Sequence, residues 1–433
     1  MTRMNWLGLG FLSPALIMVV LFFLAPVVLT GIFAFTSMST ATGITGGEYV
    51  LTSSSVRAMR DAGLPKDTAD ALENAGYVVD AKGLTALARE FDQPTADELA
   101  KLHDGARFSE RRDMESALKD LRDNRIRKTR DRKAAADLFK RSVLNERFET
   151  ETQFRATLTE AGVPPADYDL ITKQAYSGWV WTTDNIKLMF SLSSSWRYAG
   201  NTAIYVLFTL AFNVGFGLFL AISTFYLPPA QAAGFRAIWF LPRILPPVLY
   251  VLMWKWFTWD TGFISTVLAN FGISPRNWML DTATHAWVSL VLINGFVGAS
   301  MGMILFSSAI RAIPSSMLYA SEVDGANRWQ QVRYIILPQL RWPILFTTSY
   351  QTLSLLTSFE YILLATNGGP GRSTEVWALA AYHTALNNYG GNLQYGLGAA
   401  FALVLVVIGI LASLFYLRLF NFRTLVGKPL IEG

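Results

Sequence analysis

The side chains best placed to bind a solute lie on one face of an apolar stretch around residue 355. Gln351, Ser354 and Ser358 follow one another at helical spacing, so a helix presents them together with Leu355 between them. Amides and hydroxyls both donate and accept hydrogen bonds, which suits a ligand rich in hydroxyl groups. The same residue types accumulate where membrane helices pack together, and the pattern leaves that alternative open.

Three charged residues lie within or beside apolar stretches: Arg243, Lys255 and Glu360. A charge inside a membrane span is costly, so each is a candidate for function. Arg243 lies about 10 Å along a helix from Arg236, which limits how far its side chain reaches toward the membrane edge. Glu360 could bind a polar solute or form an ion pair, and the ion pair is the simpler hypothesis.

Other kinds of chemistry find little support in the sequence. There is no cysteine, which excludes disulfides, thiolate metal sites and cysteine nucleophiles. His103, His285 and His383 are too scattered to form a metal-binding pair at helical spacing. No Gly-x4-Gly-Lys-Ser/Thr phosphate loop occurs. We therefore expect no catalytic residue, no metal site and no cofactor on this chain.

The composition divides the chain into two parts. Of the 433 residues 52% are hydrophobic and only 16% are charged, against roughly a quarter charged in soluble proteins. Residues 36–195 hold 23 of the 37 Lys and Arg and 25 of the 32 Asp and Glu. The net charge is thus slightly negative on this segment and positive on the apolar remainder, and it indicates no nucleic-acid partner. The pattern predicts an all-α, polytopic membrane protein with one polar insert.

Six apolar stretches are long enough to cross a bilayer, which takes about 20 residues. They are 7–35, 201–226, 235–257, 286–310, 344–364 and 395–420. The first is longer than the apolar region of a signal peptide, so we expect a retained span rather than a cleaved leader.

The short loops predict the orientation, because basic residues in such loops favour the cytoplasm. Four arginines lie between the fourth and fifth stretches, and Arg423 and Lys428 follow the sixth. The loops on the other side carry few basic residues. We therefore expect both termini in the cytoplasm and residues 36–195 outside it.

The insert is predicted to be helical, because helix-forming stretches alternate with Gly-Pro breaks. The breaks at 62–65 and 161–164 are similar and lie 99 residues apart. They fit a duplicated hairpin, but shared helix-stop chemistry is the simpler explanation. Seven basic residues between Arg122 and Lys133 alternate with acidic ones, as in a solvated helix with i,i+4 pairs. A docking surface for a soluble partner is the alternative.

The segment 312–338 resembles the EAA loop of the membrane subunits of bacterial ATP-binding-cassette importers. The family spacing EAA-x3-G-x9-I-x-L-P falls here on Tyr319, Ala320, Ser321, Gly325, Ile335, Leu337 and Pro338. The triplet Asp324-Gly325-Ala326 is similar to the one found in the carbohydrate branch of this family. Glu322 lies between the Tyr319-Ala320-Ser321 motif and this triplet. The departure is Tyr319, where the family usually has glutamate. A short helix at 315–322, a break at Asp324-Gly325 and a second helix from Ala326 would form an elbow on the cytoplasmic face.

Two further stretches are similar to the same family. Residues 236–248 resemble its Leu-Pro-rich third core helix, and Thr366, Gly368, Gly369, Pro370 and Thr374 match the sugar-permease signature Thr-x-Gly-Gly-Pro-x-x-x-Thr. The matches cover about residues 196–420. A large insertion between early spans also resembles the larger membrane subunit of maltose permeases, in location rather than in sequence.

The resemblance implies the type I importer-permease fold: a first transmembrane helix at 1–35, an extracytoplasmic helical insert at 36–195, a five-helix core at 196–420 with a coupling elbow at 312–338, and a cytoplasmic tail at 421–433. It implies coupling to an ATPase through Tyr319, Ala320, Ser321, Glu322, Asp324, Gly325, Ala326, Ile335, Leu337 and Pro338. The solute path would involve Asn294, Gly298, Gln351, Ser354, Leu355, Ser358 and Glu360.

The implied partners are a second six-span permease subunit, two ATPase subunits that bind Mg-ATP, and an extracytoplasmic solute-binding protein that contacts the insert. The solute would be a mono- or oligosaccharide, with a polyol or glycerol phosphate as the alternatives, and the location the bacterial inner membrane. Two alternatives from other classes are a stand-alone ion-coupled transporter, in which Glu360 would carry the coupling, and a membrane-anchored sensor. Neither explains the spacing of the elbow.

Overall fold

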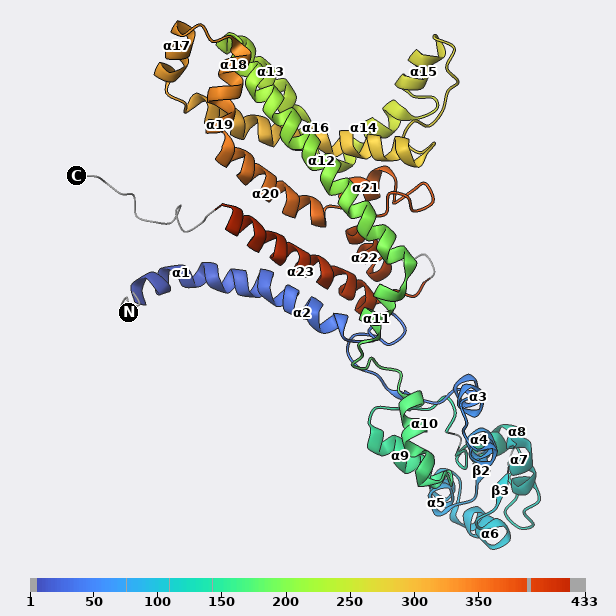
Figure 1. Ribbon diagram of the computed structural model, residues 1–433. Helices are drawn as coiled ribbons and strands as arrows, with labels where there is room; N and C mark the ends of the chain where they lie inside the picture. Colours follow the sequence, from blue (N-terminus) through green and yellow to red (C-terminus); the bar gives the residue numbers. More distant parts are fainter. Residues whose placement is uncertain (1–5, 75, 109, 142, 388–390, 421–433) are drawn as a thin grey trace. The chain divides into compact units, whose positions relative to one another are not determined.

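The computed structural model describes residues 6–74, 76–108, 110–141, 143–387 and 391–420. The predicted tail at 421–433 lies outside them. The chain forms two compact units, Met1–Thr40 together with Trp181–Gly433, and Ala41–Val180 (Figure 1). Within the described residues both units are built mainly of helices, and the strands are two antiparallel pairs of two residues each. The prediction of an all-α protein is confirmed.

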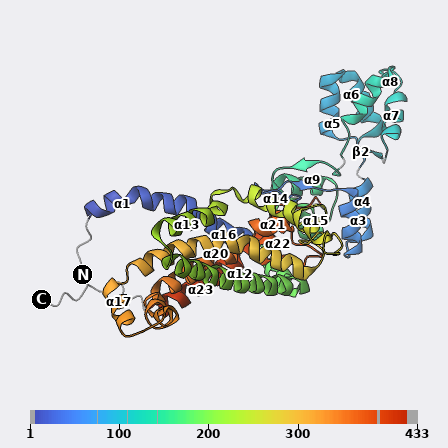
Figure 2. The same ribbon diagram turned by 90° about the horizontal axis from the view of Figure 1, so that it is seen from above.

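The first unit contains all of the long helices. In chain order they and the shorter elements between them are α1 (Trp6–Val19), η1 (Val20–Leu24), α2 (Ala25–Ala34), α11 (Asp184–Ser191), α12 (Ser193–Phe225), α13 (Pro229–Ile244), α14 (Pro247–Thr258), α15 (Phe263–Ala269), α16 (Ala283–Arg311), α17 (Ser315–Val323), α18 (Arg328–Gln331), η3 (Val332–Ile336), α19 (Leu337–Gln339), α20 (Arg341–Thr357), α21 (Glu360–Ala365), α22 (Trp377–Ala385) and α23 (Tyr395–Leu419). Helix α12 packs on α16 and α20, and α23 packs on α2, α20 and α22. Figure 2 shows these long helices from a second side.

Four helical stretches are long and apolar enough to cross a membrane. They are Gly10–Ala34, Ser193–Phe225, Ala283–Arg311 and Tyr395–Leu419. They coincide with the first, second, fourth and sixth predicted spans. The first has no buried residue in its most apolar window, so its side chains would contact lipid.

The third predicted span, 235–257, is not one continuous helix. Helix α13 ends at Ile244 and α14 begins at Pro247. The direction of Pro229–Ile244 differs by 100° from that of Pro247–Ala269, the segment that contains α14 and α15. Pro246 and Pro247 explain the break, because proline lacks the backbone donor that a helix needs and disfavours helical geometry at the residue before it.

The fifth predicted span, 344–364, is also interrupted. Helix α20 has 17 residues and stops at Thr357, and α21 starts at Glu360. Seventeen residues extend about 25 Å, somewhat less than the hydrocarbon thickness of about 30 Å. The count of six spans therefore stays a prediction, with four straight spans and one bent pair in the part of the chain that the structure describes.

The second unit consists of four similar strand–helix–helix segments. They comprise β1 (Tyr49–Val50), α3 (Ser53–Asp61) and α4 (Lys66–Asn74); β2 (Tyr77–Val78), α5 (Ala81–Glu90) and α6 (Gln93–His103); β3 (Arg107–Phe108), α7 (Arg111–Lys119) and α8 (Thr129–Asp137); and β4 (Arg147–Phe148), α9 (Glu151–Glu160), η2 (Pro165–Asp167) and α10 (Tyr168–Ala175). In each segment the helix N-cap lies two residues after the strand. Thr52, Asp80 and Thr150 cap with their side chains, and Glu110 does not.

The four segments are joined in pairs. Strand β1 pairs with β4 and β2 pairs with β3. The first and fourth segments share one core, and the second and third share another. The two similar helix breaks belong to the first and fourth segments, where Leu64 and Val163 are buried in the same core. The similarity therefore extends beyond shared helix-stop chemistry to whole hairpins.

The basic stretch is not one solvated helix as predicted. Helix α7 ends at Lys119 and α8 begins at Thr129. The intervening loop folds around Glu98, whose carboxylate accepts the backbone N–H groups of Arg122 and Asn124 at 2.6 and 2.9 Å. A carboxylate that satisfies these amides stabilises a loop here in place of a helix.

Asp80 is expected to make the insert more stable at neutral than at acidic pH. Burial alone would raise the pKa of its carboxyl, but hydrogen bonds from Arg141 and from the Gly83 amide outweigh burial and hold that pKa below its usual value. Arg141 binds both carboxylate oxygens, at 2.7 and 2.9 Å. A carboxyl with a lowered folded-state pKa stabilises the fold above its unfolded pKa of about 3.9, and this stabilisation is lost as pH falls through the folded-state value.

We therefore expect the thermal unfolding midpoint of the purified chain to exceed that of Asp80→Asn at pH 7, and the difference to narrow below about pH 4. The control is Asp70→Asn, which removes a partner of Arg60 from an exposed pair and should change stability little. An equal difference in unfolding midpoint between the chain and Asp80→Asn at both pH values would contradict the role of the Asp80 charge.

Candidate functional site

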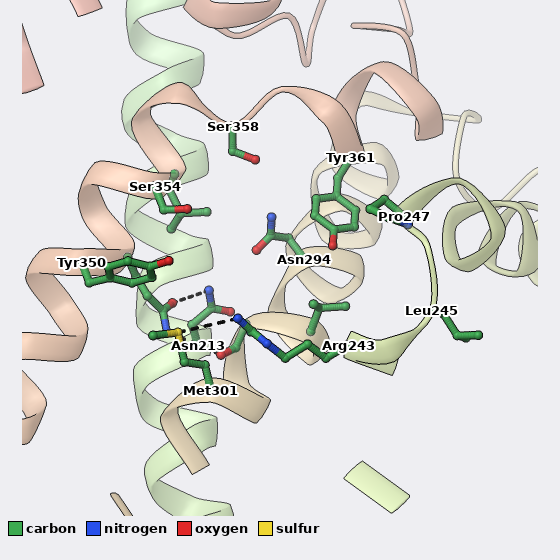
Figure 3. Close-up of a pocket in the computed structure, with 14 residues that line it drawn as sticks. Asn213, Arg243, Leu245, Pro247, Asn294, Met301, Tyr350, Ser354, Ser358 and Tyr361 are labelled. Atoms are coloured by element: carbon green, nitrogen blue, oxygen red, sulfur yellow. Dashed lines mark hydrogen bonds between the residues drawn. The ribbon is translucent and has the colours of Figure 1, made fainter. Parts of the chain in front are cut away.

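A cavity of about 330 Å³ lies among α12, α13, α14, α16, α20 and α21 (Figure 3). This volume is at the small end of the range for small-molecule sites. It is lined by Asn213, Arg243, Leu245, Pro247, Asn294, Val297, Gly298, Met301, Tyr350, Gln351, Ser354, Leu355, Ser358 and Tyr361. Most of the polar groups among these are neutral amides and hydroxyls, and one is a guanidinium.

The structure brings six of the seven predicted solute-path residues to this cavity. These are Asn294, Gly298, Gln351, Ser354, Leu355 and Ser358. The residue that it does not place there is Glu360, which begins α21 and is exposed. Helix α20 carries Gln351, Ser354 and Leu355, and it ends at Thr357. Ser358 follows directly, so the break in this span lies at the edge of the cavity.

The cavity's amides also connect helices. Asn213 and Gln351 are 2.6 Å apart and link α12 to α20. The Asn294 amide donates to the Tyr205 hydroxyl at 2.8 Å and links α16 to α12. The same amide side chains therefore line the cavity and hold its helices together. The Ser354 hydroxyl is exposed and makes no side-chain hydrogen bond within the described residues, so it can bind a ligand without losing a partner.

Asn213, Tyr350 and Tyr361 line the cavity and were missed by the sequence analysis. Tyr350 lies four residues before Ser354 and shares its helical face, so the same spacing could have found it. Asn213 is an amide within a predicted span, which is itself a signal. Tyr361 follows the break after Ser358, and no helical spacing across that break would have indicated it.

The predicted elbow is a pair of short helices between α16 and α20. Helix α17 ends at Val323, and Gly325 follows with a φ of +78°. Asn327 then caps α18 in a reciprocal arrangement with Gln330. The chain continues through the π-turn η3 and α19, which contains Pro338, into α20. Glycine is the residue that adopts a positive φ without steric cost, which is why the turn falls there.

A chain of hydrogen bonds anchors the elbow to the end of α12. The Gln331 amide donates to the Ser321 hydroxyl at 3.1 Å, and the Tyr226 hydroxyl donates to Gln331 at 3.2 Å. Both Ser321 and Gln331 are buried. Beneath them Ile313, Val332 and Ile336 form a core with residues of α12 and α16. The elbow is thus packed directly against these two helices.

The outer surface of the elbow exposes several large apolar and aromatic side chains among polar and charged ones. Val323 is 87% exposed and Tyr319 is 65% exposed. Trp329 and Tyr334 are also exposed. Of the remaining predicted coupling residues, Ala320, Glu322, Asp324 and Pro338 are exposed, whereas Ala326, Ile335 and Leu337 are half-buried. Exposed apolar groups of this kind mark interaction surfaces.

The signature Thr-x-Gly-Gly-Pro-x-x-x-Thr forms a closed loop between α21 and α22. The hydroxyls of Thr366 and Thr374 are 2.8 Å apart, and Thr374 also donates to the Gly369 carbonyl at 2.8 Å. Asn201 of α12 donates to the carbonyl of Glu375 at 2.9 Å. The two threonines therefore close the loop, which explains why this spacing requires hydroxyls at both ends, and Asn201 holds the end of the loop against α12.

Replacing Thr374 by valine is expected to lower the free energy of unfolding by about 1–3 kcal/mol, because the Thr366 hydroxyl and Gly369 carbonyl lose a buried partner. Thr374 is fully buried. Serine keeps the hydroxyl and loses one methyl group, so Thr374→Ser should cost less, about 1 kcal/mol. Denaturant or thermal unfolding of the purified chain checks this order. A valine variant as stable as the serine variant would show that the hydroxyl bonds are unimportant.

Residues 190–424 match the family described as binding-protein-dependent transport system inner membrane component. This is more than half of the chain. The chain belongs to this family. It is therefore a transport subunit of an ATP-binding-cassette importer, an inner-membrane protein with several apolar helices, and the family resemblance read from the sequence is confirmed.

Individual relatives of this chain support the same family membership. The chain is 32% identical over 254 residues to a probable ABC transporter permease protein YesP of Bacillus subtilis, covering 58% of this chain and 79% of that one. It is 31% identical over 252 residues to the maltose/maltodextrin permease protein MalF of Escherichia coli, covering 54% and 48%. A crystal structure of a bacterial alginate ABC transporter, in complex with its alginate pentasaccharide-bound periplasmic protein, has the same fold with a TM-score of 0.52, 20% identity and coverage of 57% and 85%.

Proposed function

We propose that this chain is the membrane-spanning permease subunit of an ATP-driven, binding-protein-dependent carbohydrate importer, and that the cavity is its solute site. The observation that carries this proposal is the continuity between elbow and cavity. Helix α16 runs into the elbow and α20 leaves it, and both helices line the cavity. A force applied to the elbow therefore acts on two walls of the site.

Two copies of a partner ATPase supply that force, one on the elbow of this chain and one on the elbow of a second six-span permease subunit. The chain itself has no phosphate loop. The exposed Tyr319, Val323 and Trp329 offer the ATPase a surface. Tyr319 takes the place of the family's glutamate, so we expect contact there to be apolar. Closure of the ATPases on Mg-ATP would shift the elbow and reorient the helices around the cavity.

The solute is a carbohydrate, because the cavity presents neutral hydrogen-bonding groups beside aromatic rings. Asn294, Gln351 and Ser354 donate and accept, and Tyr350 and Tyr361 offer ring surfaces. MalF of Escherichia coli is named for maltose and maltodextrin transport, which is consistent with this class of solute.

The insert, predicted as 36–195 and compact over Ala41–Val180, lies outside the cytoplasm and contacts a solute-binding protein. Support comes from its exposed basic residues. Arg122, Arg125 and Arg127 are exposed and form no ion pair among the described residues, so they are available to an acidic surface. Both chain termini then lie in the cytoplasm.

The test is purification of the chain from its own cells in mild detergent, followed by mass spectrometry and reconstitution. We expect an ATPase with a phosphate loop and a second six-span protein to remain bound, and ATP-driven sugar uptake in vesicles supplied with the binding protein. Recovery of the chain alone with ion-driven uptake would instead support a stand-alone secondary transporter. The position of Glu360 away from the cavity gives that alternative no support.

A further inference from the structure

One side chain of the cavity carries a charge that a neutral sugar would not neutralise. Arg243 lies in the last turn of α13, and its side chain points toward Asn213 and Met301 (Figure 3). The contact that its guanidinium makes there is with the Met301 sulfur, at 3.9 Å. A thioether is a weak acceptor. No Asp or Glu lies within ion-pair distance of Arg243 in the described part of the chain.

The guanidinium of Arg243 is exposed at the cavity and has no acidic partner among the described residues. Arg243 lies seven residues beyond Arg236, about 10 Å along α13, and an uncompensated charge within a membrane protein is costly. Its side chain lines the cavity and points toward Asn213 and Met301 (Figure 3). Glu360, the acid that the sequence offered as a partner, does not line the cavity. The guanidinium therefore has donors left for a ligand.

The rest of the lining favours the same ligand. Asn213, Asn294, Gln351 and Ser354 are neutral, and no carboxylate lines the cavity among the residues that the structure describes. The site thus combines several groups that bind hydroxyls with a single cation and no anion. A planar guanidinium matches the oxygens of a carboxylate, sulfonate or phosphate through two parallel hydrogen bonds.

We propose that the solute is an anionic carbohydrate whose acidic group binds Arg243 while its hydroxyls bind the neutral side chains. This deepens and rests on the proposed importer function. Arg243 is then the residue that sets specificity for the acid, and the charge of the solute compensates this exposed cation at the cavity wall during passage.

The test uses the assembled complex with its partner subunits, in detergent and without the binding protein, so that the selectivity of that protein does not enter. The probes are matched pairs that differ in one group: galacturonate against galactose, glucose 6-phosphate against glucose, and 6-sulfo-quinovose against quinovose. Binding is measured from the shift of the thermal unfolding midpoint with sugar concentration. We expect at least one acid to bind about tenfold or more tightly than its neutral counterpart.

Arg243→Gln should abolish that ratio, and Arg243→Lys should keep part of it, because a lysine retains the charge without the planar fork. Arg236→Gln is the matched control, since Arg236 lies on the same helix and does not line this cavity. It should leave the ratio unchanged.

Three binding results would overturn the proposal. They are equal binding of every acid and its neutral counterpart, including no binding of either; an unchanged ratio in Arg243→Gln; and a ratio lost equally in Arg236→Gln. If a carboxylate of another subunit neutralises Arg243, the glutamine variant will lower the midpoint without sugar and leave the ratio unchanged, which also overturns it. ATP-driven uptake of a neutral sugar with no preference for acids would refute this proposal alone, whereas absence of an ATPase partner would refute the importer function.

Discussion

Replacing Gly325 by valine should reduce ATP-driven uptake at least tenfold, whereas replacing it by asparagine should retain most of it. Gly325 has a φ of +78°, and an added Cβ would meet no atom within 4 Å. The difference between the variants therefore reflects backbone conformation and not a clash within this chain. Left-handed geometry costs most residues roughly 1–2 kcal/mol, asparagine tolerates it, and a β-branched side chain tolerates it least.

The two side chains are similar in size, which makes them a matched pair for this test. The elbow of the valine variant should lose the turn between α17 and α18, and with it the exposed surface that we propose contacts the ATPase. Uptake and ATP hydrolysis are measured on reconstituted complexes, with membrane insertion and assembly checked by purification. Equal loss in both variants would mean that side-chain bulk at the interface matters and that the turn does not. Normal uptake in both would refute the coupling role of this glycine.

The elbow could be predicted from the sequence because its determinants are local. A helix that ends at a glycine, and a second helix that begins at an asparagine cap, depend on residues within one or two turns. The structure places the cap at Asn327 and begins α18 at Arg328, two residues after the expected start at Ala326. The π-turn at Val332–Ile336 was not expected, because nothing local distinguishes it from a regular helix.

The broken spans show where hydropathy stops being informative. A window of apolar residues measures composition and is the same for a straight helix and for two helices bent by 100° at Pro246 and Pro247. The proline pair was visible in the sequence and its consequence could have been drawn. The break at Ser358 has no such marker.

Helical spacing alone could predict the candidate site only along one span. It found Gln351 and Ser354 of α20 and Ser358, which directly follows that helix, because their common face follows from the geometry of one helix. Asn294 and Gly298 of α16 were expected only from the family resemblance. That α12 contributes Asn213 and α13 contributes Arg243 depends on how helices pack.

The repeat in the insert was also hidden in the sequence. The four segments begin at Tyr49, Tyr77, Arg107 and Arg147. Their unequal spacing hides the repeat until the strands are seen paired.

Replacing Gly298 by alanine is expected to damage both the packing and the solute site. An added Cβ at this position would overlap the side-chain amide of Asn213, which is buried. Asn213 would have to turn away and give up its 2.6 Å bond to Gln351. Buried amides left without partners cost about 1–3 kcal/mol each, so we expect a clear loss of thermal stability and an uptake rate lowered at least tenfold.

The control is Gly215→Ala on α12, where an added Cβ meets nothing within 4 Å. This change should leave uptake intact and raise helix stability slightly, because alanine is the better helix former.

A double-mutant cycle separates this clash from a general intolerance of the helix interface. Asn213→Ala removes the atoms that the new methyl group would meet, so Gly298→Ala should add little further loss in that background. The two changes share one contact and their effects should therefore be strongly non-additive. Additive losses would show that alanine at 298 acts through some other contact of α16. A non-additive result would instead show that residue 298 must be small because the Asn213–Gln351 pair, which joins α12 and α20 at the wall of the cavity, lies against it. The shape of the site would then depend on the close approach of α16 and α12.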